Sequence, residues 1–172
     1  MNVSISITSA LLCPLLFGGV GDEVVVHRKV ETMGTVLWLE VHAMDRSEGL
    51  KASEEALRAV EAARARLSTW TIESELSRFL ACEVEEEFEL SALLAQELTH
   101  ARRLSDLTGG AFEPSVGALS KAWGLRSGGR TPSAQELEQA RSKCGAELWE
   151  MKGCIAVRRH SGLSIDEGGF GK

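Results

Sequence analysis

Residues 108–125 read Thr-Gly-Gly-Ala-Phe-Glu-Pro-Ser-Val-Gly-Ala-Leu-Ser-Lys-Ala-Trp-Gly-Leu, and this stretch carries the most information in the chain. A glycine pair interrupts a helical pattern, and Pro114 then sets φ near the value of a first helical residue. Residues 115–117 offer backbone N–H groups that could receive an anion or the polar edge of a ring. Two interpretations are open: a ligand cradle between a loop and a helix, or a helix C-cap joined to a type I turn. Taken alone, the motif favours the cap and turn.

A second glycine-rich stretch ends the sequence, where residues 164–172 read Ser-Ile-Asp-Glu-Gly-Gly-Phe-Gly-Lys. Together with the first stretch and two earlier motifs, it resembles the FAD:protein FMN transferases, the ApbE family. Four blocks carry the resemblance, and they follow the family's order: Met33-Gly34-Thr35, Trp70 to Phe79, Gly109 to Gly124, and Asp166 to Lys172. The resemblance runs from about residue 24 to the last residue and rests on the order of all four blocks.

The first three blocks contain five candidate ligand contacts. From the residues alone, Met33 would be core filler and Trp70 a cap on the core. The resemblance instead implies that Met33 packs on the flavin ligand and that Trp70 stacks against its ring system. It also implies that Ala111, Phe112 and Glu113 line the flavin-nucleotide site. Glu113 stands where many relatives have an aspartate, one methylene shorter.

The terminal block implies contacts to the rest of the dinucleotide and to a metal. Asp166 would hydrogen-bond the adenosine part of FAD, and Lys172 would supply another FAD contact. The backbone carbonyl of Gly169 would bind Mg²⁺, a hard cation that prefers oxygen ligands. The glycine spacing matches neither a P-loop nor a dinucleotide fingerprint. No residue is assigned a catalytic role.

The activity implied by the resemblance is transfer of FMN from FAD to a Ser/Thr hydroxyl of a target flavoprotein of the electron-transport type, releasing AMP. Mg²⁺ would neutralise charge on the pyrophosphate. Two alternatives are open: a non-catalytic flavin-binding remnant, and a Mg²⁺-dependent FAD pyrophosphatase. Relatives in the family continue beyond the position of Lys172 with about as many residues again, including an Asp and a Thr that complete the metal site. We therefore expect residues 21–172 to be the N-terminal, incomplete part of the transferase domain.

Composition excludes several other functions. The 172 residues carry 19 Lys+Arg against 25 Asp+Glu, a formal net charge of -6, which argues against a nucleic-acid partner. The four cysteines lack the spacing of a zinc site. A disulfide between Cys144 and Cys154 and free, half-buried thiols are both open, and the thiols are favoured. No histidine base follows a nucleophile-elbow pattern, so a serine hydrolase has no support.

Residues 1–20 are apolar and rich in hydroxyl groups, but they are too short to span a membrane and Pro14 interrupts them. They lack the positive start of a signal peptide, and Leu12 before Cys13 is too large for a lipoprotein acceptor. We read them as either a degraded export or lipoprotein signal or a disordered tail. The resemblance implies a periplasmic or membrane-anchored protein, with the cytoplasm as the alternative.

Hydrophobic periodicity predicts the secondary structure. The expected helices are residues 47–68 with Ser47 as cap, a single turn at 74–79, 91–107, and 132–143. The helix at 91–107 should be buried along Leu90, Leu94, Leu98, Ala101 and Leu104. The expected strands are residues 24–30, 35–43, 88–90, 147–150, 154–158 and 163–166, with a polar, mobile loop at 126–131. Irregular alternation with hairpins at both ends favours an α+β fold. The resemblance implies the T-fold-like version of it found in ApbE proteins, truncated at its C-terminus.

Overall fold

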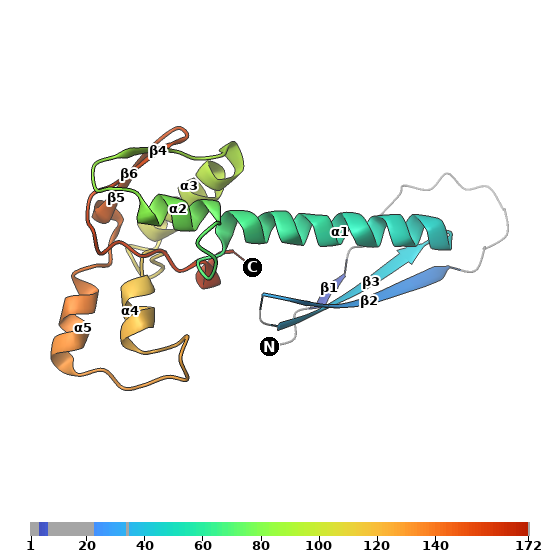
Figure 1. Ribbon diagram of the computed structural model, residues 1–172, viewed down its shortest axis with the longest axis horizontal. Coiled ribbons are helices and arrows are strands. Elements are labelled where there is room, and N and C mark those ends of the chain that lie inside the picture. Colours follow the sequence, from blue (N-terminus) through green and yellow to red (C-terminus); the bar gives the residue numbers. More distant parts are fainter. Residues whose placement is uncertain (1–3, 7–22, 34, 172) are drawn as a thin grey trace. The chain divides into compact units, whose positions relative to one another are not determined.

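The computed structural model describes residues 4–6, 23–33 and 35–171, which form two compact units divided between Ala62 and Ala63 (Figure 1). The segment 1–20, predicted to be a signal or a tail, lies outside the described residues except for β1 (Ser4–Ser6). Among the described helices, none is long and apolar enough to cross a membrane.

The first unit is built on an antiparallel hairpin of β2 (Val24–Thr32) and β3 (Thr35–Ala43). Their register runs from Val24 opposite Ala43 to Thr32 opposite Thr35, as expected for β-branched runs that alternate between two faces. The turn places Met33 at φ 50°, the left-handed conformation that two-residue hairpin turns require. β1 pairs parallel with β3, giving the order β1-β3-β2. Both predicted strands are confirmed.

The long helix α1 (Arg46–Leu67) begins in the first unit, where it packs on the hairpin. A Cβ on Gly49 would lie 2.7 Å from Cγ2 of Val26, so the close approach of helix and strand requires glycine. The buried Ser53 hydroxyl accepts a hydrogen bond from Nε of Arg28 at 3.1 Å. The predicted cap was wrong: Oδ1 of Asp45 accepts from the backbone N–H of Glu48 at 2.9 Å, so the helix starts before Ser47.

In the second unit, β4 (Glu87–Glu89), β6 (Ile155–Arg158) and β5 (Trp149–Lys152) form an antiparallel sheet in the order β4-β6-β5. Gly153, at φ 62°, turns the chain between β5 and β6. The hairpin is confirmed, although its first strand begins later than predicted. A 3₁₀ turn, η1 (Ala146–Leu148), occupies the start of the predicted strand.

Helices α2 (Glu75–Ala81) and α3 (Ala92–Leu107) enclose the core of the second unit, and Ser74 and Ser91 cap them as N-cap residues. The core residues are predominantly aliphatic with two large aromatics: Leu67, Leu76, Phe79, Leu90, Leu94, Ala95, Leu98, Leu148, Trp149, Ala156, Leu163 and Ile165. One predicted core position was wrong. Leu104 is 47% exposed, because the last turn of α3 buries Ser105 instead.

Helices α4 (Gly117–Ala122) and α5 (Ala134–Arg141) follow the first glycine block. Ser133 and Glu136 form a reciprocal capping box at the start of α5. The sequence predicted Pro114 as a first helical residue. It is instead a buried residue of the turn before α4. The predicted strand at 163–166 is extended chain instead. It forms two main-chain hydrogen bonds with residues 114–117 and belongs to neither sheet of the described residues.

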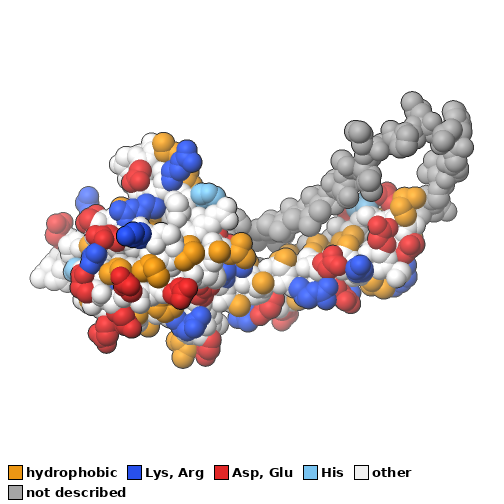
Figure 2. All heavy atoms as spheres, turned by 90° about the horizontal axis from the view of Figure 1, so that it is seen from above, with side chains coloured by type: hydrophobic (Ala, Val, Ile, Leu, Met, Phe, Trp, Pro, Cys, Tyr) orange, Lys and Arg blue, Asp and Glu red, His pale blue; other side chains and the backbone are white. Residues whose placement is uncertain are grey.

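The predicted α+β class is confirmed: separate helices and antiparallel strands, with a final 3₁₀ turn, η2 (Glu167–Gly169). Cys82, Cys144 and Cys154 are free thiols, so the alternative of a Cys144–Cys154 disulfide was wrong. Cys82 and Cys144 are half-buried and Cys154 is exposed, while Cys13 lies outside the described residues. Acidic and basic side chains are interspersed over the face shown in Figure 2.

Candidate functional site

The two glycine blocks lie against each other in the second unit. The N–H of Gly117 donates to the carbonyl of Ser164 at 2.8 Å, and the N–H of Asp166 donates to the carbonyl of Pro114 at 2.9 Å. A Cβ on Gly117 would lie 2.3 Å from Oγ of Ser164 and 2.7 Å from its carbonyl oxygen. Only glycine therefore allows the first turn of α4 to approach the terminal block this closely.

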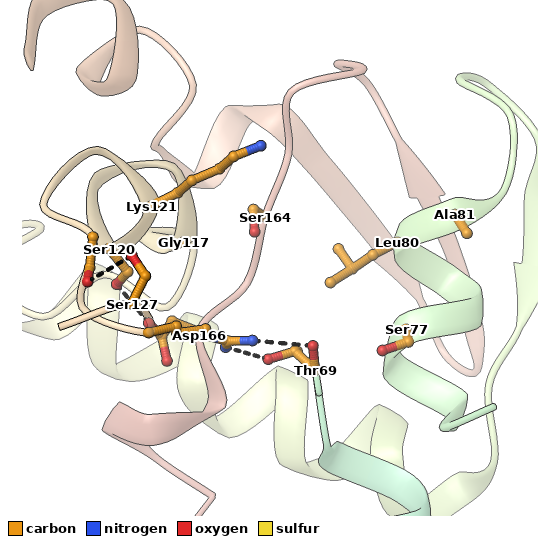
Figure 3. A pocket seen from close by; sticks show the side chains of 12 residues that line it. Thr69, Ser77, Leu80, Ala81, Gly117, Ser120, Lys121, Ser127, Ser164 and Asp166 are labelled. Carbon is orange, nitrogen blue, oxygen red and sulfur yellow. Dashed lines mark hydrogen bonds between the residues drawn. The ribbon is translucent and has the colours of Figure 1, made fainter. Parts of the chain in front are cut away.

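A cavity of about 370 Å³ opens beside this junction. It is large enough for part of a small-molecule ligand. Figure 3 shows its lining, which comes from the exit of α1, from α2, from α4 and its following loop, and from the terminal block: Thr69, Ser77, Leu80, Ala81, Gly117, Ser120, Lys121, Gly124, Arg126, Ser127, Ser164 and Asp166.

Asp166 is the carboxylate that lines this cavity. Its Oδ2 accepts a hydrogen bond from Oγ of Ser120 at 2.5 Å, and its Oδ1 accepts from the N–H of Gly168 at 3.1 Å. Each oxygen therefore keeps a lone-pair direction for a further donor. The side chain is half-buried, so a ligand can reach it. The arrangement can accept hydrogen bonds from a ligand hydroxyl or amine.

A second polar cluster joins three separate segments at the edge of the cavity. The carboxylate of Glu167 accepts from the N–H of Thr69 at 3.2 Å and from its hydroxyl at 2.5 Å. The guanidinium of Arg126 donates to the carbonyl of Thr69 at 3.0 Å and also to its hydroxyl. Arg126 lies over the ring of Trp70, 4.5 Å from the centroid, which is a cation–π distance. Trp70 is 68% exposed, so much of the indole remains accessible to a ligand.

Glu113, in contrast, is turned back onto its own loop. Its Oε2 accepts from the hydroxyl of Ser105 at 3.0 Å, and its Oε1 accepts from both the N–H and the hydroxyl of Ser115 at 2.9 and 2.6 Å. Ser115 is fully buried, and its hydroxyl oxygen also accepts a hydrogen bond from the N–H of Gly145 at 2.8 Å. The less favoured interpretation, a ligand cradle at residues 115–117, is therefore contradicted at two of its three N–H groups, because those of Ser115 and Gly117 already have acceptors within the protein.

The cap-and-turn interpretation of the first block is confirmed at its start. Gly109 and Gly110 adopt φ values of 59° and 81°, and the N–H of Gly110 returns to the carbonyl of Ser105 at 2.9 Å. Phe112 then lies beside the terminal block: a Cβ on Gly169 would be 3.7 Å from its ring. Ala111 is exposed. Neither Ala111 nor Phe112 lines the cavity beside Asp166.

Glu113 lines a different hollow of about 640 Å³, bounded by the end of α3, the start of α4 and the end of α5. Cys144 also borders this hollow, and burial raises the pKa of its thiol, with the charge of Glu113 adding to the effect. The hollow beside Asp166 is the better candidate site because it brings both glycine blocks together.

Two other candidate residues remain, Met33 and Lys172. Met33 is the exposed turn residue of the hairpin in the first unit. Lys172 lies outside the described residues, as does Gly34 of the Met-Gly-Thr motif. Gly169 belongs to η2, but within residues 4–6, 23–33 and 35–171 no three His, Cys, Asp or Glu side chains are grouped to hold a metal ion. Mg²⁺ would therefore need backbone carbonyls, water or ligand phosphates besides one or two carboxylates.

Sequence reasoning missed four residues of the cavity and its edge: Thr69, Ser120, Arg126 and Glu167. Ser120 and Glu167 stand inside the two glycine blocks, so their position was a usable signal. Arg126 stands in the segment predicted to be a mobile loop, yet its guanidinium is bonded to Thr69 and is 3.5 Å from Glu167. Nothing in the local pattern indicates these partners, because they lie 57 and 41 residues away.

A family model described as "ApbE family" matches residues 33–172. The chain belongs to the ApbE family. A curated FAD:protein FMN transferase from Vibrio cholerae is 31% identical over 147 residues, covering 82% of this chain and 43% of that protein. The chain therefore spans less than half the length of this relative of the ApbE family.

Solved structures of ApbE proteins share the fold. The flavin transferase ApbE from Vibrio cholerae matches with a TM-score of 0.73 at 29% identity, over 84% of this chain and 48% of that one. The ApbE protein from Thermotoga maritima matches with a TM-score of 0.76 at 22% identity, over 86% of this chain and 48% of that one. The predicted ApbE-like fold is confirmed, and the match covers about half of each relative.

Proposed function

We propose that this chain forms part of an FAD:protein FMN transferase and binds FAD beside the junction of its two glycine blocks. The observation that carries the proposal is that junction: in a chain of the ApbE family, residues 114–120 bond directly to residues 164–166 next to a cavity lined by Asp166. The curated relative from Vibrio cholerae, which carries this activity in its name, supports it.

The residues of this chain would then bind and orient the dinucleotide. Asp166 would accept hydrogen bonds from the adenosine part, and the hydroxyl of Ser120 would hold the carboxylate in position. Trp70 would stack on the flavin ring system through the exposed surface of its indole. Ala111 and Phe112 would line the flavin-nucleotide part. Since the carboxylate of Glu113 is already bonded to Ser105 and Ser115, its contact with the ligand would involve the backbone.

The reaction would transfer FMN to a Ser/Thr hydroxyl of an acceptor flavoprotein and release AMP. The hydroxyl oxygen would bond to the phosphorus of the FMN moiety, the bond from that phosphorus to the AMP oxygen would break, and the hydroxyl proton would leave to water or to the departing AMP phosphate. Mg²⁺, when bound, would neutralise charge on the pyrophosphate. Gly169 would offer one backbone oxygen to the ion, and its other ligands would come from water, phosphate oxygens or single carboxylates. Met33 and Lys172 complete the proposed set of contacts.

We also propose an electron-transport flavoprotein as the acceptor and a periplasmic or membrane-associated location, with the cytoplasm as the alternative. Fractionation of cells expressing the full reading frame with an epitope tag would test the location. Recovery of the protein in the cytoplasmic fraction alone would contradict it.

FAD titration of the 172-residue chain tests the site. Binding should change the fluorescence of Trp70, identified by loss of the signal in W70F, and should shift the amide resonances of Phe112 and Asp166. A chain whose fluorescence and amides stay unchanged at millimolar FAD would contradict the proposal.

A transfer assay separates binding from chemistry. The chain is mixed with FAD, Mg²⁺ and a threonine-bearing acceptor protein, and the gel is inspected for a fluorescent acceptor band. The Vibrio cholerae transferase serves as the positive control. Free FMN without a labelled band would favour the pyrophosphatase, and FAD binding without either product would favour a flavin-binding remnant.

A further inference from the structure

Arg126 presents a fixed positive charge to the cavity beside Asp166. Its guanidinium is over the ring of Trp70 at 4.5 Å, donates to Thr69 and is 3.5 Å from Oε2 of Glu167. Figure 3 draws the two hydrogen bonds to Thr69 as dashed lines. Arginine on a surface loop ordinarily retains many rotamers, and these contacts remove most of that freedom.

The anchors come from chain segments far from residue 126 in sequence, so the guanidinium is positioned before any ligand arrives. Pre-positioning lowers the entropy cost of binding. Within the described chain, Thr69 and Glu167 take three of its five N–H donors, which leaves two for a ligand. The side chain is 37% exposed and lines the cavity, so a ligand can contact it.

The charge of Arg126 is only partly offset by Glu167. That carboxylate also accepts two hydrogen bonds from Thr69, so its charge is shared among several donors. The cavity lining otherwise carries one acid, Asp166, and one further base, Lys121. Arginine forms charge-assisted, paired hydrogen bonds with phosphate, because its planar fork matches two phosphate oxygens.

We propose that Arg126, held on Trp70, Thr69 and Glu167, recognises a phosphate group of the ligand and makes this cavity selective for phosphorylated ligands over their uncharged nucleosides. The inference rests on the proposed function, since it names the part of the dinucleotide that this edge of the site receives. Asp166 then accepts hydrogen bonds from the adenosine part of the ligand, and Arg126 pairs with its phosphates.

The test compares R126Q with R130Q in the full chain. Both variants remove one positive charge from the same loop, but Arg130 pairs with Glu136 at 2.8 Å and does not line the cavity. Dissociation constants are measured for FAD, ADP and riboflavin, with thermal unfolding as a check on folding. R126Q should weaken FAD and ADP binding by about tenfold or more and leave riboflavin unchanged, because a charge-assisted bond is lost. R130Q should leave all three constants unchanged.

R126K provides the second readout, because it keeps the charge without the planar fork. It should recover part of the FAD and ADP affinity and the salt dependence that R126Q loses. If R126Q weakens the binding of riboflavin as much as that of FAD, or leaves the affinity for FAD unchanged, the role of Arg126 is overturned and the proposed function stays intact. If the unaltered chain binds ADP but not FAD, only the proposed function fails. If it binds none of the three ligands, both fail.

Discussion

Glu113 in the first glycine block and Asp166 in the terminal block are the two acids that the resemblance assigns to the ligand, and the structure gives them opposite surroundings. Three donors from Ser105 and the buried Ser115 converge on Glu113. Asp166 accepts one hydrogen bond from the hydroxyl of Ser120 and one from the N–H of Gly168, and it lines the cavity. A motif therefore does not assign a role to its acid by sequence position alone. The number of donors already facing each carboxylate distinguishes a residue that holds a loop from one that can bind a ligand.

The largest expected effect comes from removing the better-bonded acid. E113A leaves the buried hydroxyl of Ser115 and the hydroxyl of Ser105 without their acceptor, so the free energy of unfolding should fall by about 2–4 kcal/mol. Urea denaturation followed by far-UV circular dichroism measures it. E113Q keeps one acceptor oxygen and should lose less. A loss under roughly 1 kcal/mol for E113A would mean that this network does not stabilise the loop.

The second prediction concerns the other acid. D166N keeps the shape of the side chain and an acceptor oxygen, so the free energy of unfolding should change by about 1 kcal/mol or less. The affinity for FAD should nevertheless fall about tenfold, because a charged acceptor is replaced by a neutral one. Calorimetric titration gives the affinity, and S120A serves as the control that loosens Asp166 without altering its charge. A variant that loses stability as E113A does, yet binds FAD normally, would reverse the comparison.

The contrast also explains what sequence could and could not predict. The helix starts near Ser91 and Ser133 and the hairpin at 149–158 depend on neighbours in the chain, so local patterns identify them, although the cap predicted at Ser47 was wrong. Gly117 is required by Ser164, a partner 47 positions away that no local pattern reveals. The same holds for Arg126 and Thr69, while Leu104 was misplaced because its periodicity continues past the end of the core. Proximity of the two glycine blocks came from the family resemblance.

A third, smaller effect uses Cys144 as a reporter of the charge on Glu113. Burial is the main cause that raises the pKa of the Cys144 thiol, and Glu113 adds to it. The thiolate fraction, and hence the alkylation rate, should therefore rise only as pH passes through a value above that of an ordinary cysteine. Iodoacetamide labelling read by mass spectrometry should modify the exposed Cys154 first. E113Q should accelerate labelling of Cys144 at pH 8 and leave Cys154 unchanged. Equal acceleration at both sites would indicate general loosening instead.

The smallest effect belongs to a solvated carboxylate, Glu40 on β3. Its hydrogen bond to His42 lowers the pKa of Glu40, and the same bond, followed by one to Glu23, raises the pKa of His42. Because the folded pKa of His42 is raised, its stabilisation is complete below the unfolded pKa and is lost as pH rises through the folded pKa. An NMR titration should show the pKa of His42 falling in E40Q. Added salt should also lower it, since salt screens exposed charges. A pKa insensitive to both would mean that the exposed pair does not persist in solution. The partly buried hydrogen bonds of Glu113 should be less sensitive to the same salt.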